Sequence, residues 1–354
     1  MDETGCTQSG TWGGYPEWII PETVLDDWRG RVKRLTEDEA GRLLALPWVR
    51  AVAVIGSVGR GSQWPLSDVD LMTLAEPWQG RGPNDLLAEH DAERSEALLR
   101  ARIPNEVETR YWALLPERAA PEVTGQDEAF VRSVGHPYHM GCVLKAQGGR
   151  VLHDEGGRLA GFISTCERVI FSPGFLRLWL GNALREAREA LARAGDLADE
   201  GRLREASGEL IVGAHEASTG LYARWRELPQ SVMRGVTRLR DAAGRAREPE
   251  LFERFLVAAR LTEADMRARL ADVPEQGVRE LDALLAIRRG SGEDVDHLDV
   301  ALDLLHAKTY LDCRRRDEAP LHDWTGTAGD VDALGVQAHA LEDLIDALQE
   351  ATDV

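Results

Sequence analysis

Short apolar runs alternate with amphipathic segments in the first half of the chain. The apolar runs are rich in β-branched residues and stop at glycine or proline, which predicts buried strands. The predicted strands cover 50–55, 68–74, 107–115 and 143–152, the last as a strand or a hairpin. Amphipathic segments over 37–46 and 83–102 predict helices. Strands that alternate with helices indicate a mixed sheet covered by helices, in an α+β fold.

The pattern changes from Pro173 onward. Ala, Leu, Arg and Glu dominate with a period near 3.6, and Gly or Pro recurs between the amphipathic segments. This pattern is typical of a bundle of about five to seven helices. We therefore predict two domains, a mixed-sheet domain over residues 1–172 and an all-helical domain over 173–354.

Composition and charge exclude several classes of protein. Of the 354 residues, 43% are hydrophobic, and the net charge is −19. No apolar run approaches the ~20 residues of a membrane span, and the acidic N-terminus does not resemble a signal peptide. The four cysteines are scattered, without a C-x-x-C pair. We expect a cytoplasmic protein that makes no use of a membrane. The acidic charge also argues against a nucleic-acid partner, because phosphate contacts need clustered cations.

One segment combines a glycine turn with paired acids. The strand predicted over 50–55 ends at Gly56-Ser57, and after ten intervening residues Asp68-Val69-Asp70 opens the next predicted strand. Glycine allows a tight turn in which backbone N–H groups face outward and bind phosphate oxygens. Residues i and i+2 of a strand share a face, so the two carboxylates lie side by side. Such a pair is suited to Mg²⁺ ions bridged to substrate phosphates.

This arrangement resembles the nucleotidyltransferase superfamily typified by DNA polymerase beta, in which Gly-Ser precedes Asp-x-Asp by about ten residues. The resemblance implies an NTP substrate, two Mg²⁺ ions held by Asp68 and Asp70, and a catalytic nucleotidyltransferase domain over 1–172. The nucleotide-binding residues that it implies are Gly56, Ser57, Arg60 and Ser67.

The superfamily also has a third metal-binding carboxylate on a neighbouring strand. Glu106 and Glu108 both fall on one face of the strand predicted over 107–115, so the sequence leaves two choices. We favour Glu108 because it lies within the strand, whereas Glu106 follows Pro104-Asn105 at its edge.

The segment from Val107-Glu108 to the helical half resembles the kanamycin and related aminoglycoside nucleotidyltransferases. In that branch a Glu on a following helix acts as the general base, and here Glu186 or Glu189 would take that role. The reaction implied is transfer of NMP, expected to be AMP, to a hydroxyl of a small, cationic acceptor such as an aminoglycoside-like antibiotic.

The charge distribution supports a cationic acceptor. Residues 251–354 contain 23 Asp and Glu against 11 Lys and Arg, and clustered carboxylates attract cations. Two alternatives stay open: nucleotidylation of a macromolecule, either a protein side chain or a tRNA end, and a non-catalytic nucleotide-binding regulator. The intact Asp-x-Asp argues against the regulator. The sequence does not decide whether the chain works alone or as a homodimer.

Overall fold

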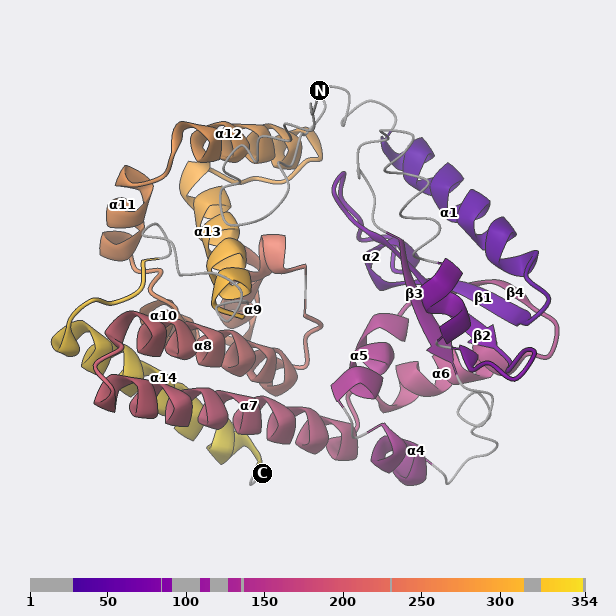
Figure 1. Cartoon of the computed structure of the whole chain (residues 1–354), viewed down its shortest axis with the longest axis horizontal. Helices are drawn as coiled ribbons and strands as arrows, with labels where there is room; N and C mark the ends of the chain where they lie inside the picture. The colour runs from indigo at the N-terminus through magenta and orange to yellow at the C-terminus, as the bar shows by residue number, and fades with distance from the viewer. Residues whose placement is uncertain are drawn as a thin grey trace, which may run out of the picture. The chain divides into compact units, whose positions relative to one another are not determined.

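The chain folds into a small sheet with helices and a largely helical region, which confirms the predicted α+β class. Figure 1 shows the computed structural model. It describes residues 28–83, 85–90, 109–114, 127–134, 137–229, 231–314 and 326–352. These residues divide into two compact units, one that ends at Leu178 and one that begins at Trp179. The division lies within helix α7, Pro173–Asp199, whose first residue is the predicted start of the helical domain.

The N-terminal unit is built on a sheet with the strand order β3-β2-β1-β4. Its strands are β1 (Val49–Ile55), β2 (Val69–Ala75), β3 (Thr109–Leu114) and β4 (Arg150–Asp154). Strands β2, β1 and β4 form an antiparallel three-stranded sheet. Strand β3 lies beside β2 and runs parallel to it. The long segment between Ala75 and Thr109 permits this, because a parallel neighbour needs a crossover connection.

The two central strands are buried, and their residues alternate between two packed faces. On one face, Val52, Val54 and Leu71 share a hydrophobic cluster with Trp28 and Leu43 of helix α1, Trp28–Leu44. Helix α6 (Arg158–Val169) contacts β1, and α5 (Pro137–Ala146) packs against α6. Burial on both faces explains why these strands are mostly apolar rather than alternating with polar residues.

Two predicted elements differ from the structure. The strand or hairpin predicted over 143–152 is wrong in its first part, because residues 143–146 complete α5 and only 150–154 form a strand. A short buried apolar run does not distinguish strand from helix by its periodicity. Helix α1 starts well before residue 37, and Thr36 lies inside it with its hydroxyl donating to the Val32 carbonyl oxygen at 2.7 Å. Residues 85–90 are helical as predicted, whereas 91–102 lie outside the described residues.

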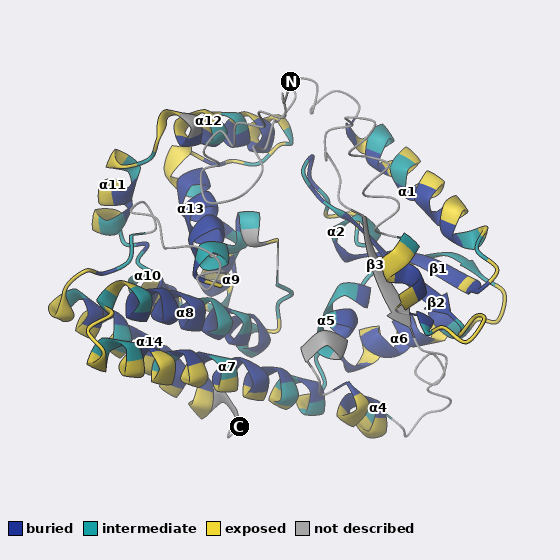
Figure 2. Ribbon diagram, in the orientation of Figure 1, coloured by how far each residue is buried: buried dark blue, intermediate teal, exposed yellow. Residues whose placement is uncertain are grey.

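The C-terminal unit consists of helices around a buried centre, as the 3.6-residue period predicts. Helix α8 (Leu203–Trp225) is buried along most of its length and packs against α13 (His297–Arg314) and α14 (Val331–Thr352), as Figure 2 shows. The other helices are α9 (Gly235–Ala246), α10 (Pro249–Ala258), α11 (Glu263–Ala271) and α12 (Glu275–Gly290). In the described ranges, no helix has both the length and the apolar character that crossing a bilayer requires. In the N-terminal unit, helix α4 covers Asp127–Ser133.

Candidate active site

The predicted glycine turn and one of the paired acids meet at the end of β1. Ile55, the last residue of β1, pairs with Asp70 of β2. The next residue, Gly56, has φ +64 and opens α2, a single helical turn over Gly56–Gly59. A Cβ atom on Gly56 would lie 2.1 Å from Oδ2 of Asp70, so no side chain fits there. The turn therefore packs its backbone directly against a carboxylate.

Asp70 is buried and forms an ion pair that the sequence analysis missed. Its side chain is 1% exposed, and Lys145 Nζ donates a hydrogen bond to Asp70 Oδ2 over 2.7 Å. Lys145 comes from the last turn of α5, in the segment predicted to be a strand. The only signal that could have drawn attention to it is its rarity, since the chain has three lysines in all.

A second cation, Arg60, acts on the same carboxylate. Arg60 follows α2 and is half-buried. Burial lowers the pKa of its guanidinium, and the negative charge of Asp70 opposes this shift. Its side chain lies on Gly148, where an added Cβ atom would come within 2.7 Å of Arg60 Cγ. Arg60, predicted to bind nucleotide, is thus held between the α2 turn and the turn that precedes β4.

The other residues of the motif differ in their exposure to solvent. Ser57 lies in α2 and is half-buried, and Asp68 is half-buried just before β2. Ser67 is 4% exposed, and its hydroxyl accepts a hydrogen bond from the Trp64 backbone N–H at 3.0 Å. The Ser67 side chain therefore stabilises the turn that leads into β2, a structural role beside the nucleotide contact predicted for it.

The third-carboxylate candidates, Glu106 and Glu108, lie outside the described residues. The described part of β3 begins at Thr109, which pairs with Val69, the residue between Asp68 and Asp70. Among the described residues there is no cluster of three or more His, Cys, Asp and Glu side chains placed to hold a metal ion. Of the three predicted metal ligands, the described part of the site therefore contains Asp68 and Asp70.

The two candidates for the general base are surface residues of α7. The Glu186 carboxylate accepts a hydrogen bond from Arg185 at 2.9 Å, and Glu189 lies 3.8 Å from Arg185. Close to Glu186 in the same unit is Glu216 of α8, which accepts a hydrogen bond from the Tyr310 hydroxyl at 3.3 Å. Burial raises the pKa of Glu216. Glu216, a carboxylate whose pKa burial in the helical unit raises, is thus one that the sequence pattern did not indicate.

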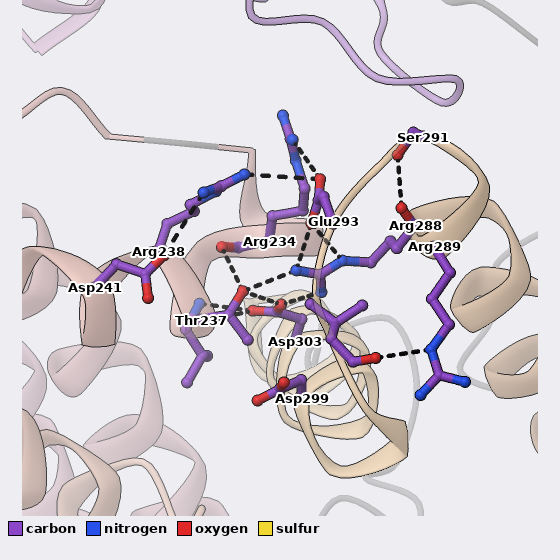
Figure 3. A network of polar contacts seen from close by, with 12 residues as sticks. Arg234, Thr237, Arg238, Asp241, Arg288, Arg289, Ser291, Glu293, Asp299 and Asp303 are labelled. Carbon is purple, nitrogen blue, oxygen red and sulfur yellow. Dashed lines mark hydrogen bonds and ion pairs between the residues drawn. The ribbon is translucent and has the colours of Figure 1, made fainter.

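The helical unit also contains a buried network of ions, drawn in Figure 3. Asp303 of α13 accepts hydrogen bonds from the backbone N–H groups of Val236 and Thr237, at 2.8 and 3.0 Å, and so caps the start of α9. Arg288 donates to the Asp303 carboxylate at 2.6 Å and to Glu293 at 2.8 Å. Each charge has an opposite partner, so this cluster serves to join α9, α12 and α13.

The comparisons with known proteins give no information on this site. No model of a known protein family matches the chain, and no curated protein sequence matches it. The link to nucleotidyltransferases consequently depends on the motif from Gly56 to Asp70 and on how the fold brings its two ends together.

Proposed function

We propose that the protein is a Mg²⁺-dependent nucleotidyltransferase. The observation that carries the proposal is the contact between the Gly56 turn and the buried Asp70. A glycine turn beside paired acids is suited to a triphosphate on one side and to metal ions on the other. In the reaction, an acceptor hydroxyl oxygen bonds to the α-phosphorus of NTP. The bond between this phosphorus and the oxygen that bridges to the β-phosphate breaks. NMP is transferred, pyrophosphate leaves, and a base takes the hydroxyl proton.

The donor set at the start of β2 fits Mg²⁺. Mg²⁺ is typically held by one or two carboxylates, with substrate phosphates and water completing its shell. Asp68 and Asp70 supply two carboxylates, and the Gly56 turn leaves Asp70 no neighbouring side chain on that side. When bound, the metal would neutralise the charge that develops on the phosphates. Lys145, which now compensates Asp70, would then be free to turn toward a phosphate oxygen.

Each residue of the site then has a proposed role. Asp68 and Asp70 bind metal, Gly56 and Ser57 contribute backbone N–H groups, and Arg60 supplies positive charge close to Asp70. Glu108 is proposed as the third acid, and Glu186 or Glu189 as the base.

The acceptor is proposed to be a small cationic molecule of the aminoglycoside type. Part of the acidic charge of the helical unit is neutralised internally, as in the pairs of Asp303 with Arg288 and of Glu280 with Lys308. Acids such as Glu342 and Asp343 remain on the surface. Surface carboxylates raise the local concentration of a polycation, an effect that salt weakens.

The proposal is tested by following radiolabelled NMP from each of the four common NTPs. The acceptors are a panel of aminoglycosides, a neutral polyol of similar size, bulk tRNA and a cell lysate. We expect transfer from ATP to an aminoglycoside, abolished by EDTA and by either Asp68→Asn or Asp70→Asn. Asp38→Asn, at an exposed position of α1, is the matched control and should keep full activity.

The outcomes separate the alternatives. Transfer to tRNA or to a lysate protein would replace the small acceptor by a macromolecule. Transfer that persists in EDTA, or binding of ATP without transfer to any acceptor, would overturn the assignment of the reaction. A rate toward the aminoglycoside that does not change with ionic strength would remove the role proposed for the acidic surface.

A further inference from the structure

Two of the groups that cover the Asp70 carboxylate differ in their freedom to move. One is the backbone of Gly56, so close that a Cβ atom there would come within 2.1 Å of Asp70 Oδ2. The other is the amine of Lys145, which donates a hydrogen bond to the same Oδ2 atom at 2.7 Å. With these contacts the Asp70 side chain is 1% exposed. A ligand from solvent therefore reaches Asp70 only after a covering group moves.

Of these two groups, the lysine is the movable one. Gly56 directly follows Ile55, which pairs with Asp70 in the sheet, so the pairing of β1 with β2 fixes the turn beside the carboxylate. Lys145 instead reaches Asp70 with a flexible four-carbon stem, and its side chain is one-third exposed. Its amine can therefore turn to solvent while the backbone stays in place.

The position of Lys145 in α5 lowers the cost of this movement. Lys145 lies in the last turn of the helix. The last carbonyl groups of a helix lack partners within it and carry partial negative charge, so a lysine there has alternative acceptors. Helix α5 itself packs against α2 and α6. A lysine that leaves Asp70 thus keeps electrostatic support from its own helix.

We infer that Lys145 is the gate of the metal site: its amine and a divalent metal ion compete for Asp70 Oδ2. Two cations at one buried carboxylate oxygen repel each other strongly. The ion pair with Lys145 must therefore break before Asp70 binds metal, and the cost of breaking it weakens the observed metal affinity. The inference rests on the proposed function in one respect, that Asp70 is a metal ligand.

The first test measures the affinity of the full chain for Mn²⁺ without nucleotide. Calorimetry and the electron paramagnetic resonance signal of free Mn²⁺ report the binding. Mn²⁺ replaces Mg²⁺ because both prefer carboxylate and water oxygens. We expect Lys145→Met to bind Mn²⁺ about tenfold more tightly than the wild type, which corresponds to about 1.4 kcal/mol for the ion pair that no longer has to break.

Three further variants control this measurement. Lys145→Arg keeps the positive charge and should bind Mn²⁺ as weakly as the wild type. Lys33→Met removes a lysine whose side chain is 72% exposed, and it should also bind like the wild type. Adding Asp70→Asn to Lys145→Met should abolish the gain in affinity, because the competition takes place at that carboxylate.

The second test uses the wild type alone. The chain has three lysines, so acetylation followed by mass spectrometry reports each of them separately. We expect Mn²⁺ to speed the acetylation of Lys145 about threefold, because the released amine turns from one-third exposed into open solvent. Lys33 should react fast with or without Mn²⁺, and Lys308, which is 7% exposed and paired with Glu280, should react slowly in both conditions.

Two results would overturn the inference. One is equal Mn²⁺ affinity of Lys145→Met and the wild type, and the other is acetylation of Lys145 that does not change when Mn²⁺ saturates the wild type. If Lys145→Met fails to fold, the acetylation test decides alone. Equal binding that depends on Asp70 in both proteins removes the gate and leaves the proposed transferase intact. Binding by neither protein overturns the metal site as well.

Discussion

The Nζ atom of Lys145 lies 2.7 Å from Oδ2 of Asp70, although 75 residues separate them in the chain. Asp70 is buried at the second position of β2, where an isolated charge would be costly. Lys145 supplies the compensating charge from α5. This pair therefore balances the buried negative charge of the candidate site.

Removing this lysine should destabilise the N-terminal unit. Lys145→Met leaves Asp70 buried with less compensation, and we expect a loss of about 2–3 kcal/mol, since the lysine is itself one-third exposed. The free energy of unfolding in urea measures it. The double variant Lys145→Met, Asp70→Asn should recover part of the loss, because the uncompensated charge is gone.

Lys33→Met is the matched control for the lysine. The Lys33 side chain is 72% exposed, and its ion pair with Glu37 is long, at 3.8 Å. Its loss should therefore change stability by less than about 0.5 kcal/mol. Equal effects of the two lysine substitutions would contradict a compensating role for Lys145.

Gly56 should tolerate no side chain. In Gly56→Ala the backbone strain of a positive φ adds to a Cβ atom 2.1 Å from Asp70 Oδ2, and we expect a loss of roughly 2–4 kcal/mol together with the transfer activity. Gly61 has φ +70 but open space around it, so Gly61→Ala should cost only about 1 kcal/mol. Thermal unfolding and turnover of both variants test whether the clash with Asp70, rather than strain, dominates.

The third acid is tested by comparing two glutamates. Glu108 immediately precedes Thr109, and Thr109 pairs with the residue between Asp68 and Asp70. We expect Glu108→Gln to lower kcat/KM by about a hundredfold or more, as loss of a metal ligand does, and Glu106→Gln to have little effect. The reverse order of the two variants would show that the other glutamate binds the metal.

The buried network of the helical unit should dominate its stability. Asp303→Asn keeps the shape of the side chain but leaves Arg288, which is 2% exposed, without its shortest ion pair. We expect a loss of about 3–5 kcal/mol in urea unfolding. Asp241→Asn breaks the exposed pair with Arg238 and should change stability by less than about 0.5 kcal/mol.

The histidine pair should make stability depend on pH. Burial, assisted by the positive charge of Arg314, lowers the pKa of His215 from 6.5 to about 4. The folded protein therefore binds fewer protons than the unfolded chain between these values, so stability is full above pH 6.5 and falls as the pH is lowered through this window. The pKa of His306 is lowered in the same direction, whereas the raised pKa of Glu216 acts in the opposite direction.

The difference between variant and wild type isolates His215. His215→Phe retains a ring to stack on Tyr310 but has no proton to gain. Between pH 6.5 and 4, the free energy of unfolding of the variant should fall by about 1–3 kcal/mol less than that of the wild type. Parallel profiles of the two proteins would show that His215 titrates alike in both states.

The local sequence was sufficient for the α+β class, for the strands around 50–55 and 69–74, and for the turn at Gly56. These features depend on short-range physics: β-branched apolar runs form buried strands, and glycine takes a left-handed turn without steric cost. The ten-residue interval between Ser57 and Asp68 also implies that β1 and β2 are neighbours. The contact between Gly56 and Asp70 was not predicted, and it follows from the pairing of Ile55 with Asp70 in the structure.

Partners far apart in the chain were decided only by the tertiary structure. The segment around Lys145 has an apolar run that suits a strand or a helix equally well, and the choice of helix is what brings its amine to Asp70. His215 and His306 are 91 residues apart, and Asp303 caps α9 from α13, so no local pattern indicates either contact. Such contacts form because packing a helix or sheet brings together residues that the chain itself keeps apart, and burial then requires each polar group to find its partner.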